Sequence, residues 1–90
     1  MKLTDKGIRE IKEAPKRIQE AIKTLEAMGG KLLGFYMVMG EYDYVGIAEV
    51  PSDEVAAAFL LGLGASGTVR TTTLKAFTVE QMATIIGRLP

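Results

Sequence analysis

The 90-residue sequence contains no cysteine, no histidine and no tryptophan, and these absences exclude several kinds of chemistry. A chain without cysteine has no disulfide framework, no thiolate nucleophile and no cysteine-bound metal cluster. A chain without histidine has no imidazole acid–base catalysis, no Ser-His-Asp triad and no histidine metal ligand. Any reaction would therefore depend on carboxylate, hydroxyl, lysine or arginine side chains, and we expect no cofactor.

The chain also lacks an excess of charge of either sign, because eleven lysines and arginines balance eleven aspartates and glutamates. A net charge of zero gives no general attraction to nucleic acid or to an anionic membrane, so we expect neither as a partner. The longest apolar run, Val55–Leu61, is much shorter than the ~20 residues of a membrane-spanning helix. Residues 1–7 lack the apolar stretch of a signal peptide, and we expect a single cytoplasmic domain over residues 1–90.

Apolar residues recur every three or four positions from Ile8 to Met28, a spacing that predicts an amphipathic helix. Pro15 interrupts this pattern, because proline inside a helix lacks an N–H and clashes with the carbonyl four residues earlier. We therefore predict a short helix to about Glu13 and a longer one from Pro15, which Gly29-Gly30 ends. Opposite charges four residues apart predict ion pairs on the exposed face, namely Lys6–Glu10, Arg9–Glu13 and Lys16–Glu20.

The rest of the chain predicts a β-hairpin, a helix, a threonine-rich strand and a last helix. The respective ranges are 31–39 and 42–50 for the hairpin, 55–63, 68–77, and from Thr78 onward. Ser52 is a suitable N-cap for the first of these helices, and Thr78 with Gln81 has the pattern of a capping box.

Both hairpin strands carry apolar side chains on both faces, although a strand with one wet face normally alternates apolar and polar residues. Helices can cover one face of the sheet, and the other face then needs a partner, most economically a second copy of the chain. We therefore predict an α+β fold, an antiparallel sheet with helices on one face, that forms a homodimer with its sheets packed face to face. This architecture is a dimeric α/β barrel.

The turn Gly40-Glu41-Tyr42-Asp43 resembles the G-x-Y-D signature of the GYD family. Three further stretches resemble the same family in the same order: residues 3–9, 14–17 and 67–77. The resemblance implies a ferredoxin-like dimeric α/β barrel, and it implies no mechanism. Family members carry an apolar first strand that ends where this chain has Leu3. Because most of that strand is absent here, we expect its place to be taken by a shifted strand 68–77, a partner segment or an exchanged element.

Few side chains remain that could form a site. The candidate ligand-binding residues are Tyr36, Tyr42, Asp43, Arg70 and Thr72. Arg70 could grip a carboxylate or phosphate, or it could form a structural bridge to Asp43, Glu41 or Glu49. Asp43 could be a base or ligand acceptor, or an ordinary turn residue that hydrogen-bonds nearby backbone. We predict no metal site, because the acids of the hairpin have no loop around them.

Three functions fit these residues, in this order of preference. The first is a homo-oligomeric small-molecule-binding or regulatory module, whose ligand would be anionic if Arg70 is to bind it. The second is a purely structural oligomerisation domain. The third is a cofactor-free enzyme with Tyr42 and Asp43 as an acid–base pair, and we assign no catalytic residue because fold does not determine function.

Overall fold

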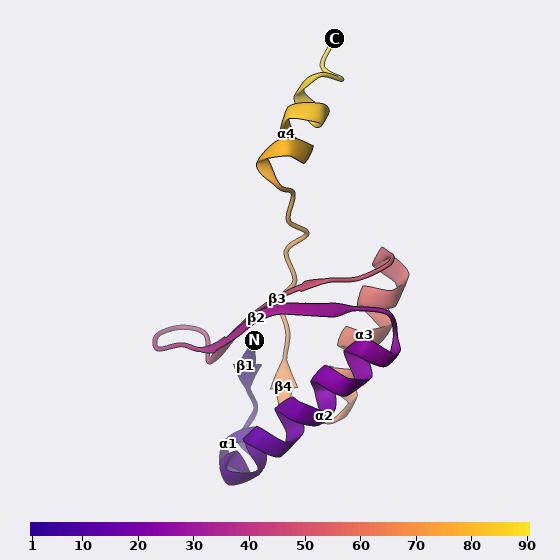
Figure 1. Cartoon of the computed structure of the whole chain (residues 1–90). Helices are drawn as coiled ribbons and strands as arrows, with labels where there is room; N and C mark the ends of the chain where they lie inside the picture. The colour runs from indigo at the N-terminus through magenta and orange to yellow at the C-terminus, as the bar shows by residue number, and fades with distance from the viewer.

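The computed structural model describes all 90 residues, and the chain begins with the element order β-α-β-β-α-β of a ferredoxin-like fold (Figure 1). A short helix follows at the C-terminal end. The elements are β1 (Lys2–Leu3), α1 (Asp5–Arg9), the 3₁₀ helix η1 (Ile11–Glu13), α2 (Ala14–Ala27), β2 (Lys31–Met37), β3 (Tyr44–Glu49), α3 (Asp53–Ala65), β4 (Val69–Arg70) and α4 (Val79–Ile86).

Met1 joins two antiparallel strand pairs into one spatial order. β2 pairs with β3, and β1 pairs with β4 through Lys2 opposite Arg70. The Met1 ammonium donates to the carbonyl of Tyr44 (2.8 Å), and the backbone N–H groups of Asp43 and Tyr44 donate to the carbonyl of Met1 (3.0 and 3.2 Å). The strand order is therefore β4-β1-β3-β2, which confirms the predicted ferredoxin-like α+β fold.

The predicted break at Pro15 is confirmed. α1 ends at Arg9, one 3₁₀ turn follows, and α2 begins with Pro15 in its first turn. The three predicted ion pairs do not form, and for the first two the reason is that α1 is too short to carry both partners. Glu10 lies at the break, and its carboxylate instead accepts from Arg17 across it (2.7 Å).

The Arg17 hydrogen bond lowers the pKa of Glu10 below the ordinary glutamate value. A lowered pKa stabilises the fold above the pKa of the unfolded chain, and that stability is lost as pH falls through the folded value. We expect Arg17→Met to raise the pKa of Glu10 and to flatten the acid dependence of unfolding. Carboxyl NMR titration measures the pKa directly. Lys16→Met is the control, and an unchanged Glu10 pKa in Arg17→Met would contradict the assignment.

The predicted strand 68–77 is wrong in its length. β4 has only two residues, and the backbone of residues 71–77 makes no hydrogen bond to other backbone groups. The reason is that β1 offers partners for Val69 and Arg70 alone. β-branched residues favour a strand, but they cannot form a ladder without a neighbour. The predicted shift of strand 68–77 into the place of the missing first strand, beside β3, is wrong as well. After Tyr44, the residues of β3 pair only with β2.

The hairpin strands are shorter than predicted, and the turn between them is longer. The predicted ranges 31–39 and 42–50 shrink to β2 and β3. The N–H of Val38 donates to the carbonyl of Asp43 (2.9 Å), which closes a loop rather than a tight two-residue turn. Gly40 has a φ of +114° in this loop, a conformation that favours glycine.

The hydrophobic core is small for a chain of this length. Leu25 and Tyr44 are its only buried large apolar side chains, and the ring of Tyr44 packs on Phe35 with 5.2 Å between centroids. The accessible surface is 7026 Å², whereas a compact monomer of this mass would expose about 5,100 Å². The radius of gyration is 15.1 Å against about 12 Å expected. The single chain therefore leaves much of its apolar surface uncovered.

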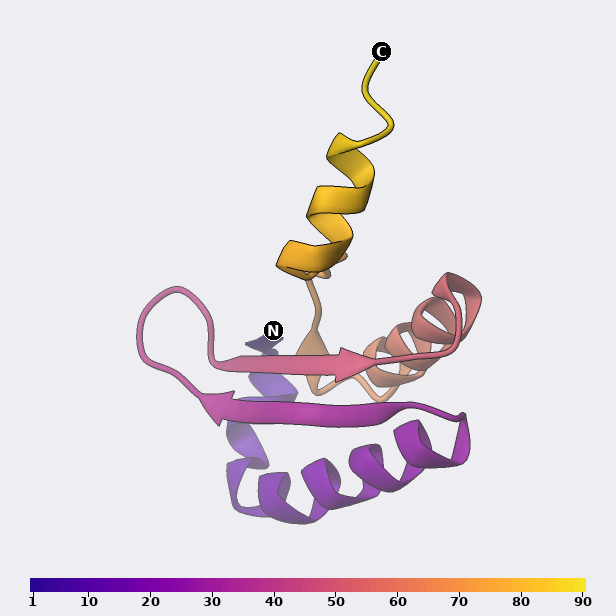
Figure 2. The ribbon, with the colours of Figure 1, turned by 45° about the horizontal axis from the view of Figure 1, so that its top comes forward.

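The C-terminal segment 71–90 extends from the body, and we call it the C-terminal arm. Figures 1 and 2 show α4 clear of the body, on the opposite side of the hairpin from α2. The predicted capping box is confirmed, because the N–H of Thr78 donates to Gln81 Oε1 (2.8 Å) and the N–H of Gln81 donates to Thr78 Oγ1 (3.1 Å). α4 is thus a specified helix, although all of its residues are exposed.

None of the helices has both the length and the apolar character that crossing a membrane requires.

Candidate functional site

One face of the β2–β3 hairpin is apolar and uncovered. Residues directly opposite each other in an antiparallel pair share a face, and alternate residues of a strand return to it. The pairs Tyr36–Val45 and Gly34–Ile47 therefore lie on one face. Their large side chains are 59% (Tyr36), 41% (Val45) and 53% (Ile47) exposed. We call Tyr36, Val45 and Ile47 the open face.

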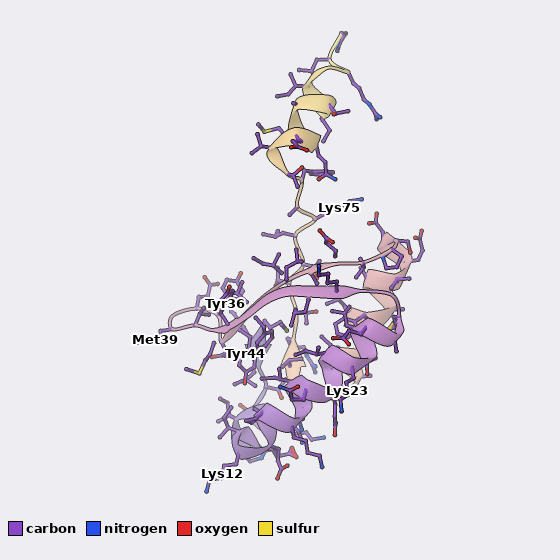
Figure 3. All side chains as sticks on the ribbon, in the orientation of Figure 1. Lys12, Lys23, Tyr36, Met39, Tyr44 and Lys75 are labelled. Atoms are coloured by element: carbon purple, nitrogen blue, oxygen red, sulfur yellow. The ribbon has the colours of Figure 1, made fainter.

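The other face of the hairpin packs toward the helices. It carries Phe35 and the buried Tyr44. Figure 3 shows Tyr36 and Tyr44 on opposite sides of the hairpin ribbon. The prediction that helices would cover only one face of a hairpin with two apolar faces is thereby confirmed.

The turn Gly40-Glu41-Tyr42-Asp43 holds β1 in place. One carboxylate oxygen of Asp43, Oδ2, accepts from the N–H of Leu3 (2.8 Å), while the N–H of Asp43 donates to the carbonyl of Met1. The ammonium of Lys2 lies 5.6 Å from the centre of the Tyr42 ring, and 3.7 Å from Glu41 Oε1. Asp43 is half-buried, and its side chain makes a long-range contact that joins β1 to the loop before β3.

Removing this contact should destabilise the fold. Asp43→Ala leaves the half-buried N–H of Leu3 without its charged acceptor, a loss of about 1.5–3 kcal/mol. Asp43→Asn keeps an acceptor oxygen and should lose less. Glu41→Ala is the control, since its ion pair with Lys2 is exposed and worth ~1 kcal/mol at most. Urea unfolding gives the three values. Equal stability of Asp43→Ala and Glu41→Ala would contradict the role of Asp43.

Arg70 makes no ion pair, so the predicted bridge to Asp43, Glu41 or Glu49 is wrong. Its guanidinium donates to the carbonyls of Gly64 (3.3 Å) and Val69 (3.1 Å) and is exposed. The reason is the strand order: β1 lies between β4 and the loop that carries Asp43, and it brings the like-charged Lys2 opposite Arg70.

The structure brings together only some of the predicted site residues. Tyr42, Asp43 and Arg70 flank β1 from its two sides, whereas Tyr36 lies on the open face and Thr72 is exposed on the arm. Two surface hollows contain none of the five. One lies between α2 and α3 with a volume of about 210 Å³, and the other lies on the arm. The ligand-binding assignment of these residues stays a prediction.

The sequence reasoning missed Val45 and Ile47 as individual residues, although the apolar character of both hairpin faces was the signal that pointed to them. It also missed Gly7, which is buried where α1 meets the loop before β4. Nothing local distinguishes that glycine from a helix-breaking one.

The model of the GYD domain matches residues 1–86, nearly the whole chain. The chain belongs to the GYD domain family. It is 36% identical over 88 residues to a protein of the bacterium Thermus thermophilus named "Glutamine synthetase and cystathionine beta-lyase binding protein". The alignment covers 97% of this chain and 90% of that relative. No solved structure gives a significant match.

Proposed function

We propose that this GYD domain protein is a homo-oligomeric regulatory module that binds a metabolic enzyme by protein–protein contact. The observation that carries the proposal is the open face, three large side chains that remain 41–59% exposed on one side of the hairpin. Soluble monomers rarely leave contiguous apolar surface of this kind uncovered. The name of the Thermus relative supports enzymes as the class of partner.

The surface area supports the homo-oligomer. The chain exposes about 1,900 Å² more than a compact monomer of its mass. Stable dimers bury about 800 Å² per subunit in a standard interface, and obligate dimers bury more. We therefore propose a homodimer in which each copy covers the open face of the other. Zero net charge gives no repulsion between the copies.

Cavity size favours a protein partner over a buried small ligand. Small-molecule sites usually have volumes of about 300–1,000 Å³ and enclose most of the ligand. The hollow between α2 and α3 has about 210 Å³, the hollow on the arm has about 240 Å³, and both are open to solvent. We propose glutamine synthetase and cystathionine β-lyase of the same cell as the first enzymes to test, because the relative's name mentions both.

One observation favours a second candidate, a small anionic effector. Lys2 and Arg70 lie opposite each other on β1 and β4, an unfavourable pair of like charges in which Lys2 has an acidic partner, Glu41, and Arg70 has none. Asp43 and Tyr42 lie beside β1, and Thr72 follows on the arm. A thermal-shift screen with carboxylate and phosphate metabolites, repeated on Arg70→Ala, tests whether these residues bind one.

Two measurements on the wild-type chain test the main proposal. Native mass spectrometry and analytical ultracentrifugation should show a dimer or a larger oligomer. Biolayer interferometry with each purified enzyme should show saturable binding, and an assay of each enzyme should show altered activity on binding. A monomer at all concentrations would overturn the oligomer. An oligomer that binds neither enzyme would overturn the proposed partner class.

A further inference from the structure

The C-terminal arm carries a second apolar surface that its own chain does not cover. The stripe of α4 consists of Met82, Ile85 and Ile86, which are 44–53% exposed, and the 70% exposed Leu89 follows just beyond the end of the helix. Their spacing places them on one side of the helix. The capping box shows that α4 is specified as a helix, yet a helix this short is marginal in water without packing. We therefore expect the stripe to pack on another apolar surface, which would stabilise the helix.

The position of the arm argues against packing on its own body. Lys75 forms an ion pair with Asp53 at the start of α3 (3.0 Å), which places the arm against the body up to that point. Only Ala76, Phe77 and Thr78 separate Lys75 from α4. A reversal of direction within so few residues favours glycine, proline, asparagine or aspartate, and this linker contains none of them.

The arm leaves on the side of the open face. α2 covers one side of the hairpin, and α4 stands on the other (Figures 1 and 2). Two sheets in direct contact lie about 10 Å apart, and a helix with its side chains is about as wide. If two copies placed their open faces directly together, α4 would have no room between them and its stripe would remain exposed. If α4 instead covers the sheet of the other copy, both the stripe of α4 and the open face are buried.

We propose that two copies exchange their C-terminal arms, so that the stripe of α4 packs on the open face of the second copy. The inference rests on the homo-oligomer of the proposed function and names the segment that covers the open face. A second copy is the occupant because the chain carries both complementary surfaces, and a two-fold axis joins them twice. The surplus of about 1,900 Å² per chain is of the size that an obligate exchanged interface buries.

Mixing two defective variants tests the exchange. Ile85→Lys places a charge in the stripe of α4, and Ile47→Lys places a charge on the open face. The exchanged dimer has two contacts between α4 of one copy and the open face of the other, so a dimer of either variant alone has a substituted residue in both. In a mixed pair, one contact joins a wild-type α4 to a wild-type open face. We expect each variant alone to weaken the dimer at least 100-fold, and an equal mixture to recover dimer. Thr84→Lys, on the opposite side of α4, is the matched control and should not change the dissociation constant.

Cysteine cross-linking gives a second measurement, because the native chain has no cysteine. Tagged Met82→Cys mixed with untagged Tyr36→Cys should form a disulfide between different copies, whereas Thr84→Cys should not. A wild-type monomer would overturn the proposed function itself. An Ile85→Lys dimer as tight as wild type would show direct sheet-to-sheet packing and overturn the exchange alone. If both variants are monomeric and their mixture forms no dimer, α4 packs on the open face of its own chain. This result would also overturn the exchange.

Discussion

Gly7→Ala should be among the most destabilising single substitutions in this GYD domain protein. Gly7 is buried in α1, and a Cβ there would lie well inside van der Waals contact of the Thr68 carbonyl oxygen and 2.9 Å from Leu3 Cδ2. The Thr68 oxygen cannot turn away without a loss, because it accepts from the N–H of Thr4 (3.0 Å). Thr4 Oγ1 also donates to the carbonyl of Gly67 (2.6 Å), so two hydrogen bonds fix this approach.

The sign of the effect depends on two opposing terms. Alanine in a helix interior is favoured over glycine by about 1 kcal/mol, since glycine loses more backbone entropy on folding. Overpacking costs about 1–3 kcal/mol and more where backbone has to move. The clash is with backbone and the core is small, so we expect a net loss of roughly 2 kcal/mol or more in the free energy of unfolding, measured in urea.

Gly62→Ala in α3 is the matched control. A Cβ at Gly62 meets no atom within 4 Å, so only the helix-propensity term remains and the variant should gain up to ~1 kcal/mol. The two glycine-to-alanine substitutions should therefore move the urea midpoint in opposite directions. A Gly7→Ala protein as stable as wild type would show that α1 does not approach the Thr68 backbone as described.

Local signals in the sequence were sufficient for the helices. The break at Pro15 and the caps at Ser52 and Thr78 depend on residues within a few positions of each other, and all three are confirmed. The Ser52 hydroxyl accepts from the N–H of Val55 at 3.2 Å, as a helix N-cap does. Such features can be predicted because the interacting groups are close neighbours along the chain.

Features that depend on distant neighbours could not be predicted in this way. Residues 71–77 have strong β-propensity, but a strand also needs a partner, and β1 reaches only as far as Arg70. Asp43 has the character of a turn residue, yet its carboxylate accepts from Leu3, forty positions earlier. An acidic partner was one of two alternatives for Arg70, and the strand order places Lys2 opposite it instead. In each case the register of β1 decided the outcome.

The apolar pattern of the hairpin predicts that one face needs cover, but it does not identify what covers that face. Apolar residues on both parities of the hairpin predicted that one face would need cover, and the structure places that face at Tyr36, Val45 and Ile47. The pattern could not say what covers it, because a second sheet, a helix or another protein would select similar side chains. The arm adds the missing information, since it supplies an unpacked amphipathic helix on the same side (Figure 1).

Ile47→Lys should have the largest effect on assembly. Ile47 is 53% exposed in the single chain, so burying the rest of the side chain contributes roughly half of the about 1.5–3 kcal/mol of a full burial, and the cost of desolvating the lysine ammonium brings the loss per contact to about 1.5–3 kcal/mol. In a dimer with two-fold symmetry every contact occurs twice, so the loss doubles to about 3–6 kcal/mol, which raises the dissociation constant by roughly 10² to 10⁴. The folded monomer should remain intact, because Ile47 faces away from Phe35 and Tyr44.

Leu61→Lys is the control that shows whether any lysine in place of an exposed apolar residue weakens the dimer, or only a lysine on the open face. Leu61 is 75% exposed on α3 and belongs to the helical side of the molecule, so this substitution adds the same charge without touching the open face. Sedimentation equilibrium should give a wild-type dissociation constant for Leu61→Lys and a much weaker one for Ile47→Lys, while circular dichroism shows both folded. Equal dissociation constants for the two variants would mean that the dimer forms elsewhere, and the open face would then be free to serve as the surface that binds the enzyme.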